Sequence, residues 1–293
     1  MEREDIYIVT ADLAGPPFDT IREKYPQRFV SVGIAEQNLI SVSAGLALAG
    51  KRVIAYGPEP FIISRALDQI RNGICAMHVP VTIVGLGTGL NNAEYGATHF
   101  VTEDVAIMGL CPGISQITVN DEDICEAAFT YMLHCDSPLY LRLDRICGGH
   151  LDAASSVSIQ NGFRMLQQSN SKICIVAEGY PVHQISSMDW GYEGPNVLEV
   201  FAHPFDEAAL LDALRKMDQI VVCEEQQRRS GLGTVLLELF NDSHITKRVI
   251  RMGVDYQGSY PGTYGPREYW IRHYGFDTDA LRECVLSLEG RIQ

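Results

Sequence analysis

The sequence predicts an α/β protein made of two consecutive open, mostly parallel sheets covered by helices. Short apolar segments rich in β-branched residues alternate with helical segments, first over residues 6–143 and again over residues 172–288. Near-continuous apolar strands separated by helices are typical of parallel sheets that are buried on both faces. The chain has 293 residues, of which 46% are hydrophobic and 20% charged, and this favours two ordinary domains with their own cores.

The first series of elements follows from apolar periodicity and turn residues. Strands are expected at 6–10, 29–32, 53–56, 81–86, 114–119 and 139–143. Helices are expected at 36–49, 61–77, 102–110 and from a cap at Asp121 to about residue 134. The 36–49 helix is apolar nearly all round, so we expect it to be buried on most sides. A polar, glycine-rich loop at 87–98 follows the fourth strand.

The second series begins after a Gly-, Ser- and Ala-rich stretch at 146–171, which predicts the boundary between two domains, 1–150 and 165–293. Strands are expected at 172–177, 197–200, 220–223 and 248–252, and helices at 206–217, 233–240 and 278–288. Residues 253–276 combine glycines, prolines and aromatic residues, which predicts a long loop before the last helix.

Charge and targeting features narrow the class of protein. The chain has 23 Lys and Arg against 37 Asp and Glu, a net charge of −14, which argues against nucleic-acid binding. No apolar run is long enough for a membrane span, and the charged start lacks the apolar stretch of a signal peptide. The eight cysteines have no Cys-x-x-Cys spacing, so we expect reduced thiols rather than disulfides or a zinc site. A cytoplasmic enzyme or enzyme subunit is the expectation.

Three segments after predicted strands carry polar side chains to the edge where parallel sheets bind ligands. Glu36 heads an apolar helix, where a desolvated carboxylate can share a proton with a ligand nitrogen, although acids are also common in a first helical turn. His99 directly follows the 87–98 loop, and a histidine at such a place is more often structural. Arg142 and Arg145 lie at a strand end, where an arginine can clamp an anion or simply pair with Asp144. The dinucleotide fingerprint Gly-x-Gly-x-x-Gly is absent.

Four motifs, in this order, together resemble one family. They are Gly33-Ile34-Ala35-Glu36-Gln37, the run from Ser64 to Arg71, Gly96-Ala97-Thr98-His99 followed by Glu103-Asp104, and Leu141-Arg142-Leu143-Asp144-Arg145. This set resembles the pyrimidine-binding domain of transketolase and its relatives. Residues 172–293, with Val222-Cys223-Glu224-Glu225 and Gly231-Leu232-Gly233, are similar to the transketolase C-terminal domain. The resemblance covers nearly the whole chain.

In that family thiamine diphosphate is held between two chains, so the resemblance implies this cofactor, shared with a partner chain. It implies that Glu36 hydrogen-bonds N1′ of the aminopyrimidine, that Phe61 packs on that ring, and that Arg65 belongs to the same cofactor site. His99 matches a histidine that orients or protonates the substrate's carbonyl and hydroxyl oxygens, and Arg145 matches an arginine at the phosphate end of the substrate channel.

The other half of the family's cofactor site has no counterpart in this sequence. Gly-Asp-Gly, which with a later Asn binds the metal on the diphosphate, occurs nowhere in the 293 residues. The resemblance therefore implies that Mg²⁺ is bound by a partner chain, an N-terminal-half transketolase subunit with the diphosphate-binding domain, in an α2β2 assembly. No metal ligand is expected in this chain.

The sequence departs from the family at two positions around the substrate. Tyr95 stands where the family has an acid that contacts a substrate hydroxyl, and Pro58 stands where it has a second pocket aromatic. We assign Tyr95 to substrate binding and expect altered recognition, with a modified sugar, a nucleotide-linked sugar or a 2-oxo acid as donor. The expected reaction is transfer of a two-carbon unit from a ketose or related donor to an aldehyde. A β-type subunit of a 2-oxo acid dehydrogenase E1 component and a catalytically inactive subunit are the alternatives.

Overall fold

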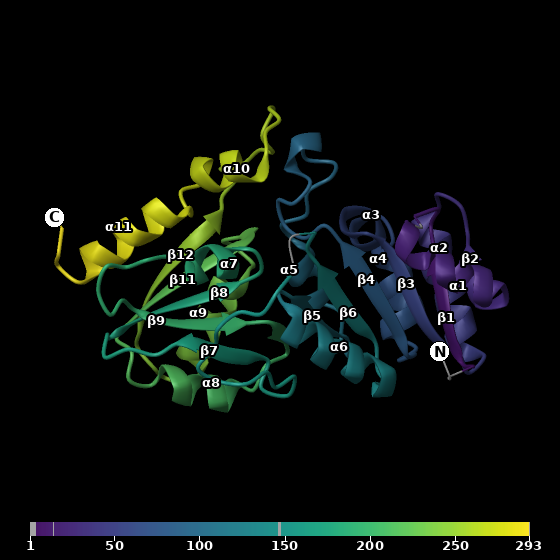
Figure 1. Cartoon of the computed structure of the whole chain (residues 1–293), viewed down its shortest axis with the longest axis horizontal. Helices are drawn as coiled ribbons and strands as arrows, with labels where there is room; N and C mark the ends of the chain where they lie inside the picture. Colours follow the sequence, from purple (N-terminus) through teal and green to yellow (C-terminus); the bar gives the residue numbers. More distant parts are fainter. Residues whose placement is uncertain (1–3, 14, 146–147, 293) are drawn as a thin grey trace.

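Two open sheets lie side by side in the computed structural model, which describes residues 4–13, 15–145 and 148–292 (Figure 1). The first sheet is formed mainly by the N-terminal half of the chain and the second by the C-terminal half, as the sequence predicts. The predicted domain boundary starts at residues 146 and 147, which lie outside the described residues.

The first sheet has the strand order β10-β5-β6-β4-β3-β1-β2. Its strands are β1 (Ile6–Thr10), β2 (Phe29–Ser31), β3 (Arg52–Pro58), β4 (Val81–Leu86), β5 (Ser115–Val119), β6 (Leu139–Leu143) and β10 (Ala202–His203). All of these pairings are parallel except β10 with β5. β10 comes from the C-terminal half, so the second series of elements supplies one edge of the first sheet.

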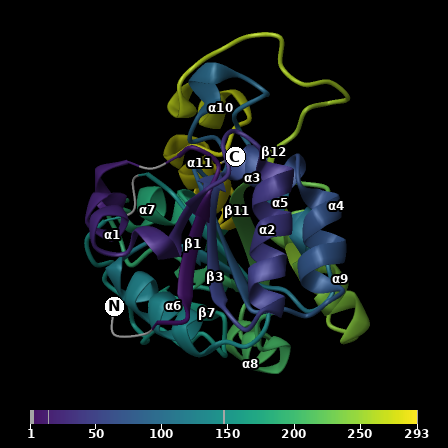
Figure 2. The ribbon, with the colours of Figure 1, turned by 90° about the vertical axis from the view of Figure 1, so that its right-hand side faces the viewer.

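Helices cover both faces of the first sheet (Figure 2). They are α1 (Asp19–Lys24), α2 (Glu36–Leu48), α3 (Glu59–Ser64), α4 (Leu67–Gln69), the π-helix η3 (Ile70–Cys75), α5 (Asp104–Gly109) and α6 (Glu122–His134). On one face, Leu39 and Ile40 of α2 pack with Ile62 and Ile74 against β1, β3 and β4. On the other face, α6 packs on β5 and β6.

The second sheet has the order β12-β11-β8-β9-β7 and is parallel except for β7 with β9. Its strands are β7 (Phe163–Gln167), β8 (Ile173–Glu178), β9 (Asn196–Val200), β11 (Gln219–Gln227) and β12 (Arg248–Val254). Its helices are α7 (Pro181–Ser186), α8 (Glu207–Leu214), α9 (Leu232–Asp242), α10 (Arg267–His273) and α11 (Thr278–Leu288). Helices α7, α10 and α11 cover one face, and α8 and α9 cover the other.

Several predicted elements differ from the structure. The helix predicted over 61–77 is broken into α3, α4 and η3, with the break at Arg65 and Ala66. The weakly periodic stretch 146–171 contains strand β7, and the loop predicted over 253–276 contains helix α10. In each case long-range packing supplies what local periodicity lacks, because β7 pairs with β9 and Trp270 of α10 fills the second core.

Helix α2 is not buried on most sides in this chain. Glu36, Leu39, Ile40, Ser43, Ala44 and Ala47 face the sheet. The opposite face carries Gln37, Asn38, Ser41, Gly45 and Leu48, which are exposed. The helix is therefore half exposed in this chain, although the apolar residues Val42, Leu46 and Leu48 are among those left partly or fully exposed. Among the described residues, none of the helices has the length and apolar character that crossing a bilayer requires.

Candidate active site

The C-terminal ends of β2, β3 and β4 lie at one edge of the first sheet, because these strands are parallel to one another or to β1. Glu36 follows β2, Phe61 follows β3, and His99 follows β4. The parallel arrangement therefore brings together residues that are 25 or more positions apart in the chain, at the edge where open α/β sheets bind ligands.

Glu36 is the first residue of α2 and is only 3% exposed. Its Oε2 atom accepts a hydrogen bond of 2.6 Å from Nη1 of Arg65, and Gln37 Nε2 donates to the backbone oxygen of Arg65 at 3.2 Å. A carboxylate is favoured at the N-terminus of a helix, and the arginine gives this buried charge a partner. The break between α3 and α4 falls at Arg65 and Ala66, next to this ion pair.

Aromatic rings continue the site from this ion pair. The Arg65 guanidinium carbon lies 4.7 Å from the centre of the Phe61 ring. The rings of Phe61 and His99 meet edge to face with centroids 5.2 Å apart, and the Tyr95 and His99 rings are also 5.2 Å apart. Glu36, Arg65, Phe61, His99 and Tyr95, all singled out from the sequence, thus form one contiguous series of contacts.

The turn that carries His99 is closely defined. The backbone N–H of His99 donates to the Gly96 oxygen at 2.9 Å, and Nδ1 of His99 lies 2.8 Å from the Thr98 hydroxyl oxygen. Gly96 has φ near +78°, a left-handed conformation that glycine adopts without steric cost. The imidazole is therefore held through one nitrogen and by its own backbone.

Arg142 lies near the C-terminal end of β6 and Arg145 follows the strand, and their surroundings differ, which corrects the prediction that both lie at the mouth of the sheet. Arg142 is 3% exposed, and its Nε atom donates to Asp104 Oδ2 at 2.6 Å. Arg145 is exposed, and its charge acts on Tyr56, whose pKa is nevertheless raised because burial outweighs it. Within the described part of the chain, no contact joins Arg145 to the His99 ring.

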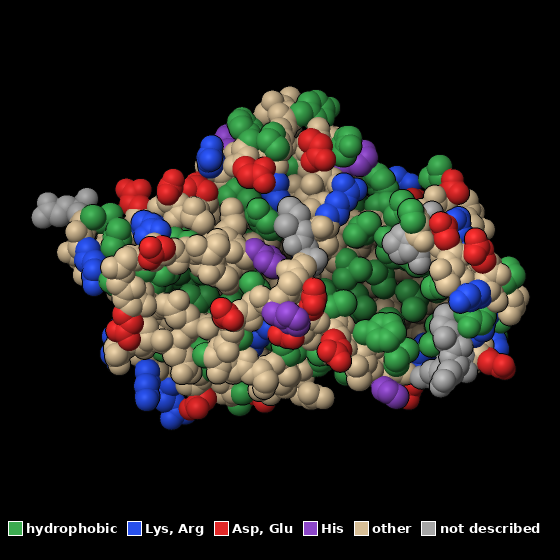
Figure 3. Space-filling view, in the orientation of Figure 1, with side chains coloured by type: hydrophobic (Ala, Val, Ile, Leu, Met, Phe, Trp, Pro, Cys, Tyr) green, Lys and Arg blue, Asp and Glu red, His purple; other side chains and the backbone are tan. Residues whose placement is uncertain are grey.

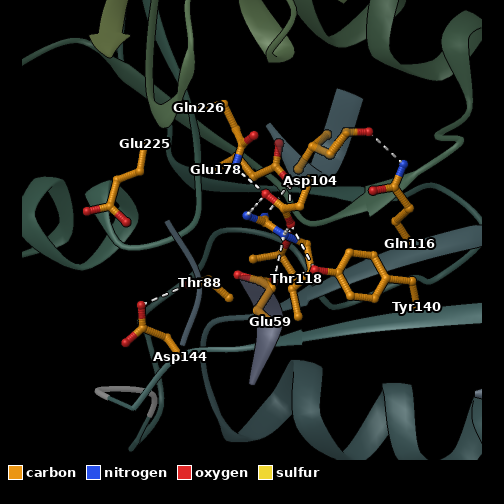
Figure 4. A network of polar contacts seen from close by, with 12 residues as sticks. Glu59, Thr88, Asp104, Gln116, Thr118, Tyr140, Asp144, Glu178, Glu225 and Gln226 are labelled. Carbon is orange, nitrogen blue, oxygen red and sulfur yellow. Dashed lines mark hydrogen bonds and ion pairs between the residues drawn. The ribbon is translucent and has the colours of Figure 1, made fainter. Parts of the chain in front are cut away.

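A buried polar network lies between the two sheets (Figure 4). Arg142 also lies 3.3 Å from Glu178 Oε1, at the end of β8, and donates to the Thr118 hydroxyl at 2.8 Å. Gln226 of β11 donates to Asp104 Oδ1 at 2.8 Å. Burial opposes ionisation of Glu178, yet its pKa lies below the usual value because His203 and Arg142 favour the carboxylate.

Glu59 belongs to the same network and was missed by the sequence analysis. It is fully buried, and burial, helped by the nearby Asp104 carboxylate, raises its pKa well above the usual range. The Tyr140 hydroxyl is bonded both to Glu59 Oε1 and, at 2.9 Å, to Asp104 Oδ2. A hydroxyl has one proton, so both bonds form when protonated Glu59 donates to Tyr140 and Tyr140 donates to Asp104. The acid between two prolines in Pro58-Glu59-Pro60 was the available sequence signal.

A second network supports the loop that leads to His99. Arg267 of α10 pairs with Glu225 of β11 and, at 2.6 Å, with Asp144. Asp144 accepts hydrogen bonds from Thr88 at 3.0 Å and Asn91 at 2.8 Å, both in the loop after β4. The second sheet therefore anchors the loop that carries Tyr95 and His99.

Comparison with known proteins gives this geometry a context. Residues 1–148 match the family described as the transketolase pyrimidine-binding domain. The chain is 29% identical over 273 residues to an apulose-4-phosphate transketolase subunit of Actinobacillus succinogenes, covering 91% of this chain and 86% of that protein. It is 30% identical to a 6-deoxy-6-sulfo-D-fructose transketolase subunit of a Clostridium species, covering 81% of this chain and 76% of that one.

Solved structures share the fold of this chain. A chain described as a split-gene transketolase, in an inactive β4 tetramer, superimposes with a TM-score of 0.80 at 24% identity, covering 97% of this chain and 91% of the other. Transketolase from Leishmania mexicana gives a TM-score of 0.78 at 18% identity, and the match covers 98% of this chain but 43% of that enzyme. At these identities the likeness shows the fold.

Proposed function

The chain belongs to the transketolase family, and from this premise we propose that it is the subunit of a thiamine-diphosphate-dependent enzyme that transfers a two-carbon unit from a ketose or related donor to an aldehyde. The observation that carries the proposal is the contact series from Glu36 through Arg65 and Phe61 to His99. A buried carboxylate, an aromatic face and an imidazole at one sheet edge suit a cofactor with an aminopyrimidine ring and a substrate with polar oxygens.

The residues of the site fit the cofactor's pyrimidine half. Glu36, 3% exposed at the start of α2, would exchange a proton with the pyrimidine nitrogen N1′, and the ring of Phe61 would pack on the pyrimidine. Arg65 would keep the Glu36 carboxylate in place by the ion pair that it already makes. Thiamine diphosphate, when bound, supplies the carbon nucleophile that carries the two-carbon unit.

His99 is proposed to act on the substrate rather than on the cofactor. Its Nδ1 atom is engaged by Thr98, so Nε2 would hydrogen-bond the carbonyl or hydroxyl oxygen of the substrate. Exposed Tyr95 lies beside His99 and would contact the substrate next to that oxygen. Exposed Arg145 would attract an anionic group at the far end of the substrate.

The donor is proposed to be a modified ketose. A tyrosine at position 95 offers one hydroxyl and an apolar ring, whereas an acid would accept two or more hydrogen bonds from a sugar. Two similar proteins are named for modified sugars, one for apulose 4-phosphate and one for 6-deoxy-6-sulfo-D-fructose. Both the residue and these relatives favour a sugar with fewer or displaced hydroxyl groups.

The cofactor's diphosphate and its Mg²⁺ are proposed to be held by a partner chain. The sequence contains no Gly-Asp-Gly, and the described residues hold no cluster of three His, Cys, Asp or Glu side chains that could hold a metal ion. The similar proteins of comparable length are named as transketolase subunits. We expect two copies of this chain with two copies of an N-terminal-half transketolase subunit. Light scattering of the co-expressed pair should give a 2:2 mass, and a fully active 1:1 complex would contradict the assembly.

The proposed roles are separated by exchange of the cofactor's C2 proton for deuterium in the complex of the two subunits. Glu36→Gln keeps the shape of the side chain but removes the acid, so exchange should slow by roughly 10²–10⁴-fold. His99→Ala should leave exchange close to the wild-type rate but impair turnover. Equal slowing by both substitutions, or none by Glu36→Gln, would refute the assignment. Oxidation of a 2-oxo acid with an artificial electron acceptor, without ketose consumption, would assign the chain to the alternative E1 class.

A further inference from the structure

Tyr264 belongs to the segment that joins β12 to α10, yet its ring packs directly on Gly96 in the loop before His99. A Cβ atom added to Gly96 would fall 2.5 Å from Tyr264 Cε1 and 2.9 Å from Cδ1. The space beside Gly96 that a Cβ atom would occupy is therefore already filled by the Tyr264 ring, and the ring lies directly against the glycine backbone. Figures 1 and 2 both show the two segments side by side above the sheets.

Gly96 lies in the middle of the turn that orients Tyr95 and His99, the two residues proposed to contact the substrate. Tyr95 directly precedes it, and the Gly96 oxygen accepts the backbone hydrogen bond from His99 at 2.9 Å. The Gly96 amide itself donates to the Ala93 oxygen at 3.0 Å. The Gly96 backbone thus takes part in both hydrogen bonds of the turn, and the His99 ring that follows the turn meets the Phe61 ring.

The segment that carries Tyr264 is fixed on its C-terminal side. Gly265 lies against the Tyr269 ring, and the Trp270 indole N–H donates to the Gly265 oxygen at 3.2 Å. Arg267 is 4% exposed and is held by Glu225, whose Oε2 also lies 3.4 Å from the Leu90 amide nitrogen. The same buried carboxylate thus anchors the Tyr264 segment and the start of the His99 loop.

The segment is also tied to the other end of the His99 loop. The Phe100 and Tyr256 rings stack with centroids 6.2 Å apart, and the Tyr256 and Thr102 hydroxyl oxygens lie 2.7 Å apart. The Tyr260 ring centroid lies 6.4 Å from that of Phe100. Figure 3 shows hydrophobic side chains gathered at the top of the molecule, over α10 and the 87–98 loop. The C-terminal half of the chain therefore contacts the loop at three places. Glu225 of β11 lies at its start, Tyr264 at its turn, and Tyr256 and Tyr260 at its end.

We propose that Tyr264, from the C-terminal half of the chain, is a positioning residue for the substrate-side turn: its ring holds Gly96, and through it Tyr95 and His99, in the orientation that meets Phe61. Tyr264 is 71% exposed, so its removal takes little from the hydrophobic core. The effect of losing the ring is therefore local to residues 93–101 rather than global.

Hydrogen–deuterium exchange of the full chain tests this without partner, cofactor or substrate. Tyr264→Ala should speed exchange of peptides spanning 93–101 about tenfold, since the amides of Gly96 and His99 open more often, while peptides of α6 stay unchanged. Tyr264→Phe keeps the ring and should restore the wild-type rate. Unchanged exchange at 93–101, or faster exchange throughout the chain, overturns the proposal.

The kinetic consequence rests on the proposed function. In the complex with the partner chain, Tyr264→Ala should lower kcat/KM for the ketose about tenfold but leave C2 proton exchange at the wild-type rate, because the turn carries the proposed substrate contacts Tyr95 and His99, whereas Glu36, the proposed proton-exchanging group, lies on α2. Loss of complex assembly, with exchange at 93–101 unchanged, would make Tyr264 an interface residue and refute the positioning role. If the complex shows no transketolase activity at all, the exchange experiment still decides the inference.

Discussion

Replacing Arg142 by Met tests the network that joins the two sheets. Arg142 is 3% exposed and lies 2.6 Å from Asp104, 3.3 Å from Glu178 and 3.7 Å from Glu59. Methionine has a similar stem but no charge, so the surrounding apolar contacts are largely kept. The substitution therefore isolates the loss of the cation.

The loss of folding free energy depends on the buried carboxylates that remain without a counterion. Removing one partner of a buried ion pair typically costs about 3–5 kcal/mol, because the remaining charge has neither water nor a counterion. Here Asp104 and Glu178 both lose their guanidinium contact, and the Thr118 hydroxyl loses a hydrogen-bond donor. We expect a loss near the upper end of that range. Arg142→Met with Glu178→Gln should recover part of it, since one uncompensated carboxylate is gone.

The loss should depend on pH with a definite sign. Without Arg142 the folded state binds protons at the buried carboxyl groups more readily than the unfolded state does. Stability of the variant therefore falls as pH rises, and the deficit should be larger at pH 8 than at pH 5.5. Urea unfolding followed by circular dichroism measures it, with Arg22→Met as control. Arg22 pairs with Asp19 at the surface and should cost less than about 1 kcal/mol. A variant as stable as wild type, or a deficit independent of pH, would refute the reasoning.

Three further predictions concern the site and its surroundings. Burial raises the pKa of Glu224 to about 7 from its usual 4.5, so its stabilising contribution is complete below pH 4.5 and is lost as pH rises through about 7. In urea unfolding, Glu224→Gln should remove about 3 kcal/mol of the change in unfolding free energy between low and high pH. Wild type and variant with parallel plots of unfolding free energy against pH would contradict this. The isolated chain should bind thiamine diphosphate with Mg²⁺ only weakly in calorimetry, and tight binding by this chain alone would contradict the shared site. Tyr95→Asp should lower the KM for an ordinary ketose phosphate in the assembled enzyme, because a carboxylate accepts hydrogen bonds from sugar hydroxyls; an unchanged KM would show that residue 95 does not meet the substrate.

The positions of the strand ends could be predicted from the sequence, because each depends on a short local pattern of apolar residues. Short apolar strands separated by helices predict a parallel sheet, and a parallel sheet places all its C-terminal ends at one edge. Glu36, Phe61 and His99 follow three such ends, so their meeting could be expected without knowing any distance. The motif Gly231-Leu232-Gly233 also has a local reason, since the amides of Leu232 and Gly233 donate to Glu224 and a Cβ on Gly231 would overlap that carboxylate.

The break at Arg65 was not predictable from the apolar positions around it. Ile62, Ala66, Ile70 and Ile74 recur at helical spacing, and all four are buried. The chain nevertheless interrupts the helix at Arg65 and Ala66, where Arg65 reaches Glu36, and continues as a π-helix whose Gly73 meets Ala44 of α2. Contacts with α2, not local propensity, set that geometry.

The sequence by itself determined the alternating fold and the sheet edge at which the candidate site lies, because both depend on periodicity within a few turns of chain, whereas the candidate residues at that edge came from the resemblance to the family. The tertiary structure decided which of two nearby arginines is buried. Arg142 turns inward because Asp104 and Glu178 arrive from other elements to neutralise it, whereas Arg145 stays at the surface. It also placed Tyr264 on Gly96, 168 positions earlier in the chain. These contacts depend on how the two sheets pack. A local sequence pattern cannot predict them, because the free energy of burying two groups together depends on residues that are distant in the chain.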